Sequence, residues 1–256
     1  MISFGGLARI LPLVLLVILW QLITGFQFVN QEFLPSPESV AAAFVDLARS
    51  GDAITNLSVT IFRAICGLVL GGVVGIPIGL LMARSKRFRA YVTPIVGGTY
   101  SLPKAAIIPL LMLWFGIGNV TAISAVFLAC LLPLIVNTFH GVTATPKVLI
   151  WSAAALGTSE QKMLWLVFFR HALPDVFTGL RMALGFSFVL AISAEMIAST
   201  NGIGKLIFMY GENGTYSYMF AAIIFIVVVA FLADRALLAV TNYSLRWHDW
   251  SVSQHE

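Results

Sequence analysis

Six long apolar stretches constrain this chain of 256 residues more than any other feature of its sequence. A helix that crosses a membrane needs about 20 mostly apolar residues, and each stretch provides roughly that length. The six stretches cover residues 10–26, 61–83, 91–115, 120–139, 176–198 and 219–240. The sequence therefore predicts an all-α integral membrane protein, in which residues 1–256 form a single domain with six transmembrane helices.

The composition excludes several classes of soluble protein. Hydrophobic residues make up 59% of the chain and charged residues only 10%, whereas an ordinary soluble domain carries about 25% charged residues. A soluble fold of this length could not bury so much apolar surface, so a soluble enzyme, a disordered chain and a nucleic-acid-binding domain are excluded. We therefore expect a lipid bilayer, and no nucleic acid, as the partner of the apolar surface.

The positions of the basic residues predict the orientation of the chain. Six spans place ten of the fifteen basic residues on one side of the membrane, with Arg235 and Arg246 at or after the end of the sixth span: Arg9, Arg84, Lys86, Arg87, Arg89, Lys147, Lys162, Arg170, Arg235 and Arg246. Because Lys and Arg accumulate in cytoplasmic loops, we expect both termini to be cytoplasmic. The first stretch could instead be a cleaved signal peptide, but no small-x-small cleavage site follows it in residues 23–27.

A short helix is expected on the outer side, over about residues 37–50. Ser36 is a helix-capping residue, Pro37 suits the first helical position, and Gly51 suits the end of the helix. Val40, Phe44 and Leu47 form an apolar face. This face could lie on the outer membrane surface, but the preferred interpretation is a connector between two spans.

The inner loop over about residues 143–173 is predicted to form two helices with a break between them. The second helix is expected to begin near Ser159 and to end before Pro174. The segment around the break is rich in small residues and consists of Trp151, Ser152, Ala153, Ala154, Ala155, Leu156, Gly157, Thr158 and Ser159. A partly apolar hairpin of this kind needs either a membrane surface or a protein partner, and the residues alone leave both open.

The second stretch carries a stripe of glycines four residues apart: Gly67, Gly71, Gly75 and Gly79. Small residues at this spacing allow two membrane helices to pack closely. We therefore predict that this helix lies among other helices and that the stripe is a packing surface rather than a ligand site.

Two charged residues lie inside the fifth stretch. Arg181 and Glu195 are fourteen residues apart, so at about 100° per residue they return to nearly the same face of a helix, and Ser199 extends that face. A charge in a span usually faces the bundle interior or water, so the stripe predicts a helix that lines a translocation path. The alternative is that Arg181 snorkels inward and Glu195 outward to the membrane interfaces.

The third stretch is interrupted by three prolines, Pro94, Pro103 and Pro109. Broken helices at membrane depth are tolerated where they line a cavity or pack on protein. The polar residues at this break, Tyr100, Ser101 and Lys104, are therefore further candidates for the translocation path. Arg63 is another, because it is a charge inside the second stretch.

No reactive arrangement of residues suggests an enzyme. The four histidines lie outside the middle of any span and have no carboxylate or cysteine at metal-ligand spacing. The sequence has neither a serine–histidine arrangement nor a phosphate-binding Walker A loop. We expect no catalytic residue, no metal site and no cofactor bound by this chain.

Five stretches between residues 34 and 247 resemble a known family. They are LPSPESV (34–40), GVVGIPIGLLMARS (72–85), LPKAAIIPLLMLWFGIGN (102–119), ALPDVFTGLRMALGFSF (172–188) and AEMIASTNGIGKLI (194–207). In this order and topology the chain resembles the membrane permease subunit of bacterial ATP-binding-cassette (ABC) importers, of the nitrate/sulfonate/taurine type. The resemblance implies a type I importer permease fold with a cytoplasmic coupling helix.

The inner loop resembles the cytoplasmic loop that is the signature of this family. Its second alanine and its glycine correspond to Ala153 and Gly157, and its second Leu-Pro to Leu173-Pro174. The chain departs from the pattern where Trp151 stands for the usual glutamate and Phe169-Arg170 for the first Leu-Pro. The resemblance implies that this loop docks on an ATPase, which favours the protein partner.

The resemblance also implies the partners of the chain. They are a cytoplasmic ATPase dimer that binds ATP and Mg, a second copy of the permease, and a periplasmic substrate-binding protein, assembled at the bacterial inner membrane. The substrate is expected to be a small anion or a related polar solute. The alternative functions are a secondary transporter or channel that works without an ATPase, and an integral membrane enzyme.

Overall fold

The computed structural model describes residues 4–30 and 32–247, and for residues 4–10 and 13 it describes the backbone alone. Arg9, one of the basic residues used for orientation, therefore has no described side chain. Every regular element in the described ranges is a helix. The chain divides into two compact units, one of residues 1–59 and 201–228 and the other of residues 60–200 and 229–256.

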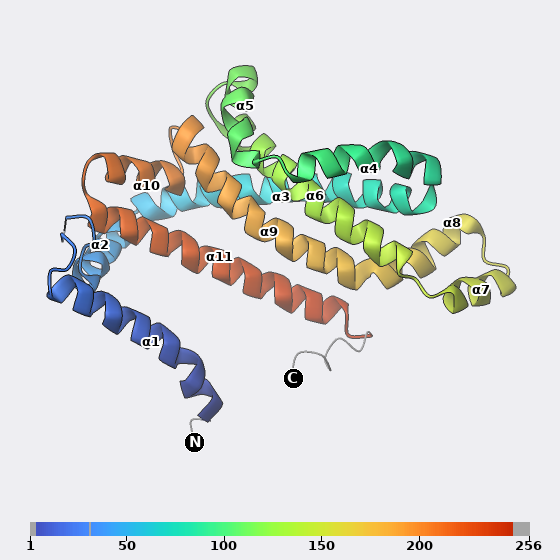
Figure 1. The fold of residues 1–256 in the computed structure, drawn as a ribbon, viewed down its shortest axis with the longest axis horizontal. Helices are drawn as coiled ribbons and strands as arrows, with labels where there is room; N and C mark the ends of the chain where they lie inside the picture. The colour runs from blue at the N-terminus through green and yellow to red at the C-terminus, as the bar shows by residue number, and fades with distance from the viewer. Residues whose placement is uncertain (1–3, 31, 248–256) are drawn as a thin grey trace. The chain divides into compact units, whose positions relative to one another are not determined.

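Within the described residues, four helical stretches are long and apolar enough to cross a membrane. They are α3 (Asp52–Arg84), α6 (Asn119–Thr143), the stretch Glu160–Ala198 that ends in α9 (Arg170–Ala198), and α11 (Tyr216–Ser244). A fifth span is formed if α4 (Lys86–Tyr100) is joined to η1 (Lys104–Ile107) and α5 (Ile108–Phe115), a pair that bends by 94° at a break that contains Pro103 (Figure 1).

The first predicted span corresponds to α1 (Phe4–Gly25), a helix of 22 residues. Its described apolar part, Val14–Gly25, is shorter than a membrane span. Residues 4–10 and 13 of the same helix have no described side chains, so they cannot be counted toward the apolar length. The sixth transmembrane helix, and with it the prediction of a single six-span domain, therefore stays a prediction.

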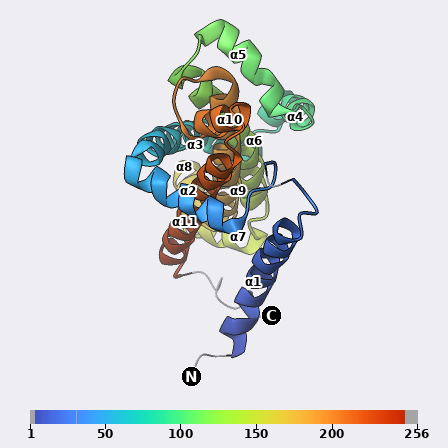
Figure 2. The same ribbon diagram turned by 90° about the vertical axis from the view of Figure 1, so that its left-hand side faces the viewer.

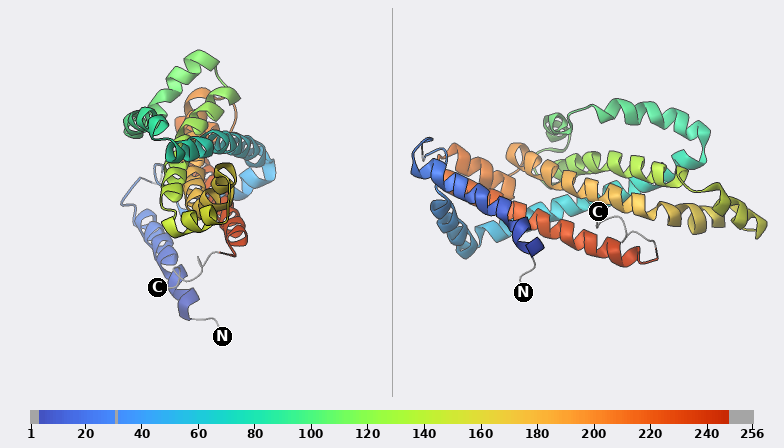
Figure 3. Two further views of the ribbon diagram at one scale, coloured as in Figure 1. Left: turned by 90° about the vertical axis from the view of Figure 1, so that its right-hand side faces the viewer. Right: turned by 60° about the horizontal axis from the view of Figure 1, so that its bottom comes forward.

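The core of the second unit is the packing of α6 against α9, which lie side by side (Figures 1 and 3). Small buried residues such as Ala129 and Ala191 allow the two helices to approach closely. The glycine stripe of α3 lies on α6: a Cβ atom added at Gly71 would be 2.8 Å from the Cβ of Cys130, and one at Gly79 would be 2.7 Å from the carbonyl oxygen of Ile135. The stripe is therefore a close packing surface.

In the first unit, α2 (Pro37–Ser50) has the ends that the capping residues predict (Figure 2). The Ser36 hydroxyl accepts a hydrogen bond from the Ser39 N–H at 3.3 Å, and Gly51 adopts a left-handed φ of 80°. Val40 is buried, and the ring of Phe44 stacks on that of Phe225 of α11 with centroids 4.0 Å apart. The apolar face thus packs on protein, as a connector helix requires, rather than facing a membrane surface.

Two further contacts belong to this unit. The Asn56 side chain of α3 accepts a hydrogen bond from the Gly202 N–H at 2.7 Å, at the start of α10 (Ile203–Glu212). The indole of Trp20 donates to the carbonyl oxygen of Pro35 at 3.1 Å. These contacts hold the segments that precede α10 and α2.

The inner loop forms α7 (Lys147–Ala155), α8 (Glu160–Met163) and a π-helical segment, η2 (Leu164–Phe169). The expectation that its second helix ends before Pro174 is wrong, because the helix continues through η2 into α9. Ala172 and Val176, on either side of this proline, are buried against Leu80 and Val142. Their burial offsets the cost of the proline, which removes one backbone donor and crowds the carbonyl four residues earlier.

Candidate functional site

The hairpin of α7 and α8 projects beyond the ends of α6 and α9 (Figures 1 and 3). At the end of α7, the Gly157 N–H donates to the Ala154 carbonyl at 3.0 Å, and the Thr158 N–H donates to the Ala153 carbonyl at 3.1 Å. This pair of bonds is the Schellman motif, in which the residue at Gly157 must be left-handed. Gly157 has a φ of 73°, and a Cβ atom there would meet nothing within 4 Å, so its role in the hairpin is conformational.

The tip of this hairpin exposes large apolar side chains. Trp151 and Leu156 are exposed, Leu156 by 86%. Ala154 and Ala155 are also exposed, while Ala153 and Thr158 are half-buried. An apolar surface of this kind marks an interaction site for another protein or a membrane. The sequence-predicted loop residues therefore lie together on one accessible tip.

An ion pair joins the hairpin to the adjacent end of α3. Arg84 Nη2 lies 3.0 Å from Glu160 Oε2, and both side chains are largely exposed. An exposed pair of this kind contributes about 0–1 kcal/mol, so it places the hairpin more than it stabilises the fold. It also shows that the basic segment after α3 and the α7–α8 hairpin lie at the same end of this unit.

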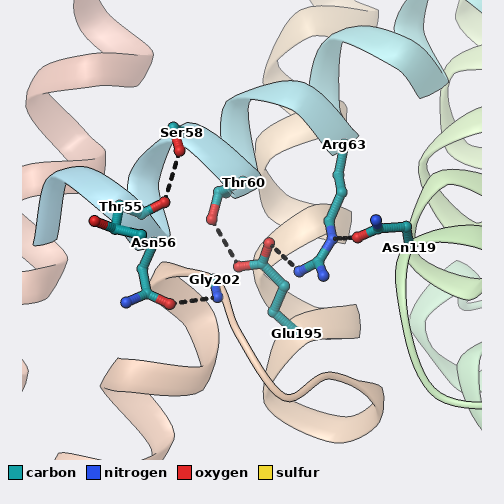
Figure 4. A network of polar contacts seen from close by, with 8 residues as sticks. All are labelled: Thr55, Asn56, Ser58, Thr60, Arg63, Asn119, Glu195 and Gly202. Atoms are coloured by element: carbon teal, nitrogen blue, oxygen red, sulfur yellow. Dashed lines mark hydrogen bonds and ion pairs between the residues drawn. The ribbon is translucent and has the colours of Figure 1, made fainter. Parts of the chain in front are cut away.

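A buried network of charged and polar side chains joins α3, α6 and α9 (Figure 4). Arg63 Nη1 lies 2.8 Å from Glu195 Oε1, and the Thr60 hydroxyl donates to Glu195 Oε2 at 2.8 Å. Arg63 Nε donates to Asn119 Oδ1, also at 2.8 Å. The side chains of Arg63 and Glu195 are 1% and 0% exposed. We refer to Thr60, Arg63, Asn119 and Glu195 as the buried clamp.

The clamp changes the interpretation of Glu195. Its complete burial in an ion pair contradicts the idea that it snorkels to the outer interface. Removing one partner of a buried pair costs about 3–5 kcal/mol because the other charge is left without compensation. The clamp therefore fixes the ends of three helices to one another, and the Gly118 N–H adds a bond of 3.1 Å to the carbonyl of Ala198 nearby.

Arg181 does not share the surroundings of Glu195. Its Nε and Nη2 atoms lie 2.7 and 3.1 Å from the two carboxylate oxygens of Asp234 in α11. Arg181 is 47% exposed and Asp234 26%. The predicted stripe of α9 is thus accessible at Arg181 and buried at Glu195, with Ser199 buried one turn further on.

The break between α4 and α5 carries the remaining path candidates. Tyr100 and Ser101 are exposed, and Lys104 Nζ donates to the Tyr100 carbonyl at 3.3 Å while lying 5.8 Å from the centre of its ring. A pocket of about 380 Å³ lies beside this break, between α3, α4 and α6. Apart from Thr99 and Lys104 its lining is apolar.

Three residues of the buried clamp and of the Arg181–Asp234 ion pair were not identified from the sequence: Thr60, Asn119 and Asp234. Asp234 had a usable signal, because it is a carboxylate inside the sixth apolar stretch. Thr60 and Asn119 had none, since both are ordinary polar residues beside the ends of expected spans. Among the side chains that the structure describes, no group of three or more His, Cys, Asp or Glu residues could hold a metal ion.

Comparison with known proteins identifies the family. Residues 75–241 match the family model described as the inner membrane component of binding-protein-dependent transport systems. The chain belongs to this family. It is 30% identical to an aliphatic sulfonates transport permease protein of Bacillus subtilis strain 168, over 96% of this chain and 89% of that protein. It is 32% identical to the taurine transport system permease protein of Escherichia coli strain K12, over 96% of this chain and 90% of that protein.

The fold also matches solved structures. An inward-facing form of the MetNI methionine ABC transporter aligns with a TM-score of 0.66 at 19% identity, over 77% of this chain and 97% of that chain. The predicted type I importer permease fold and the resemblance to ABC importer permeases are confirmed. The protein is a multi-pass membrane permease subunit of an ABC importer, which works with a binding protein and with a separate ATPase subunit. Family membership decides against a transporter without an ATPase and against a membrane enzyme.

Proposed function

We propose that two copies of this chain form the inner-membrane path of an importer for small organic anions of the sulfonate type. The names of the relatives in B. subtilis and E. coli support this substrate class, because both refer to sulfonates or taurine. The ammonium group of Lys104 at the break beside exposed Tyr100 and Ser101 would favour an anion. We assign these three residues and Arg181 to the path, and the buried clamp and Ser199 to its support.

We further propose that the α7–α8 hairpin docks on the ATPase. The observation that carries this assignment is the exposed apolar tip around Trp151 and Leu156. ATP and Mg would be bound by that partner alone. The departure from the family pattern at Trp151 replaces a carboxylate with an exposed aromatic ring, so the contact at this position would be apolar.

The continuity of the helix beyond the hairpin supports a coupling mechanism. Glu160–Ala198 forms one helical stretch of 39 residues, which at 1.5 Å per residue is about 58 Å long. It begins at the hairpin and reaches Glu195 of the buried clamp. A movement that the ATPase imposes on the hairpin would therefore be passed along one rigid element to the clamped ends of α3 and α6.

The orientation belongs to the same proposal. The hairpin and the basic segment Arg84–Arg89 lie at one end of their unit, joined by the Arg84–Glu160 pair. We infer that this end is cytoplasmic, with both termini on the same side. The clamp then lies toward the periplasm.

The test of the function is ATP-dependent uptake by proteoliposomes that contain this permease, its ATPase and its binding protein. We expect uptake of taurine or an alkanesulfonate, and loss of both uptake and ATPase co-purification in the Ala154→Trp variant, because a bulky ring would block docking. Ala90→Trp is the matched control, since Ala90 is also exposed and lies on the end inferred to be cytoplasmic. Normal co-purification by Ala154→Trp would contradict the docking assignment, and uptake without ATP would contradict the function.

A further inference from the structure

A second pocket, of about 640 Å³, lies beside the hairpin in the second unit. It is formed by α7, η2, the first turn of α9 and the residues that follow α11. Its polar side chains are Arg170, His171 and Trp247, and its apolar lining includes Leu149, Leu166 and Leu173. The pocket therefore combines basic groups with an apolar wall.

The basic groups of this pocket are available to a ligand. Arg170 is exposed and His171 half-buried. The ion pairs found among the described side chains join Arg63, Arg84, Arg181 and Arg235 to carboxylates, and none of them reaches Arg170. A guanidinium group with five donors in a planar fork suits the oxygen atoms of a phosphate. The pocket thus has the charge and the donors to bind an anionic phosphate group.

The pocket lies where two membrane helices end. Arg170 begins α9, and Trp247 follows the last turn of α11. The Trp247 indole donates to the Ser244 carbonyl at 3.0 Å, and the side chain is 58% exposed. Exposed tryptophans at the ends of spans are typical of the membrane interface, at the depth of the lipid headgroups.

We propose that this pocket binds an anionic phospholipid of the cytoplasmic leaflet. Arg170 and His171 would bind the phosphate of the headgroup, while an acyl chain would lie along Leu166 and Leu173. Basic pockets between membrane helices on the cytoplasmic side are suited to such lipids. The proposal rests on the proposed orientation, in which the hairpin end is cytoplasmic.

A lipid fits this pocket better than the ATPase does. The proposed docking surface is the tip of the hairpin, whereas the pocket lies at its base, beside two membrane-spanning helices. Four of the lining residues, Leu149, Leu166, Val167 and Leu173, are apolar, and Leu173 belongs to α9 itself. An occupant with a charged head and an apolar chain matches both halves of the lining.

The experiment is native mass spectrometry of the purified transporter complex titrated with dioleoyl phosphatidylglycerol. We expect tighter binding of this lipid than of dioleoyl phosphatidylcholine. The Arg170→Gln variant should bind phosphatidylglycerol about fivefold more weakly, which corresponds to the loss of one basic residue at a membrane surface. Arg87→Gln is the matched control, because Arg87 is exposed at the same end and does not line the pocket.

Several results would overturn the proposal. One is equal affinity of the Arg170→Gln and Arg87→Gln variants for phosphatidylglycerol, and another is equally tight binding of phosphatidylcholine. Displacement of the lipid by inorganic phosphate would assign the site to a free anion. Loss of the ATPase from the Arg170→Gln complex, with lipid binding unchanged, would assign it to protein docking. Lipid binding needs no transport, so its failure is distinguishable from a failure of the proposed function.

Discussion

Arg63 and Arg84 each form an ion pair across helices, but in opposite surroundings. Arg63 is 1% exposed and its partner Glu195 is fully buried, whereas Arg84 and Glu160 are 47% and 84% exposed. Loss of one member of a buried pair leaves a charge without compensation, while an exposed charge is solvated when its partner is removed. The same Arg→Gln substitution at these two positions therefore compares the loss of a buried ion pair with the loss of an exposed one.

We predict that Arg63→Gln lowers the stability of the protein by about 3–5 kcal/mol and that Arg84→Gln lowers it by about 0–1 kcal/mol. The measurement is thermal or denaturant unfolding of the purified protein in detergent. The double variant Arg63→Gln/Glu195→Gln should be more stable than the sum of the two single changes predicts, because neither charge is then left alone. Equal losses for Arg63→Gln and Arg84→Gln would contradict the clamp.

The members of the clamp could be recognised only in part from the sequence. Arg63 and Glu195 stood out because a charge in an apolar stretch is costly. Their pairing did not, since 132 residues separate them and no local pattern links the two. The helical periodicity of one span instead suggested a common face for Arg181 and Glu195, but the neighbouring helices decide which part of that face is buried.

The packing of α3 on α6 makes a prediction at the scale of the helix. A Cβ atom at Gly71 would lie 2.8 Å from the Cβ of Cys130, whereas one at the adjacent Gly72 meets nothing within 4 Å. We predict that Gly71→Ala destabilises the protein by about 1–3 kcal/mol through overpacking. Gly72→Ala should be neutral or stabilising by up to about 1 kcal/mol, because alanine is the better helix former.

Unfolding of the two alanine variants, measured side by side, tests this prediction. Each replaces one glycine of the same helix, so differences in helix propensity cancel. If Gly72→Ala were the more damaging of the two, the packing face of α3 would be assigned to the wrong side.

Local chemistry predicted the elements well where a helix end is capped. Ser36, Pro37 and Gly51 were sufficient for the bounds of α2. The rule that helices stop before proline failed at Pro174, because the burial of Ala172 and Val176 outweighs the lost donor. The π-helical segment Leu164–Phe169 was also not foreseen, since single-sequence periodicity does not distinguish it from an ordinary helix.

At the scale of the whole chain, the number of spans decides where the N-terminus lies. If the bent pair of α4 and α5 counts as one span, the five spans of the described residues would place the two ends of the chain on opposite sides of the membrane, and a sixth formed by α1 would place them on the same side. The distribution of basic residues favours six by one residue, because Arg9 joins the other nine on the cytoplasmic side only if α1 crosses the membrane.

Thiol labelling distinguishes these topologies. In a background with Cys66 and Cys130 replaced by alanine, we predict that an impermeant maleimide labels Asn213→Cys in intact cells, because the segment between α10 and α11 is then periplasmic. Ser159→Cys, at the exposed hairpin, should be labelled only after the cells are opened, and a cysteine appended to the N-terminus should behave like Ser159→Cys.

Labelling of the N-terminal cysteine in intact cells, with Ser159→Cys still protected, would mean that α1 does not cross the membrane. Exchange of the patterns of Asn213→Cys and Ser159→Cys would instead reverse the orientation and remove the hairpin from the ATPase side. The comparison of the N-terminal cysteine with Ser159→Cys therefore decides the span count, and the comparison of Asn213→Cys with Ser159→Cys decides the orientation.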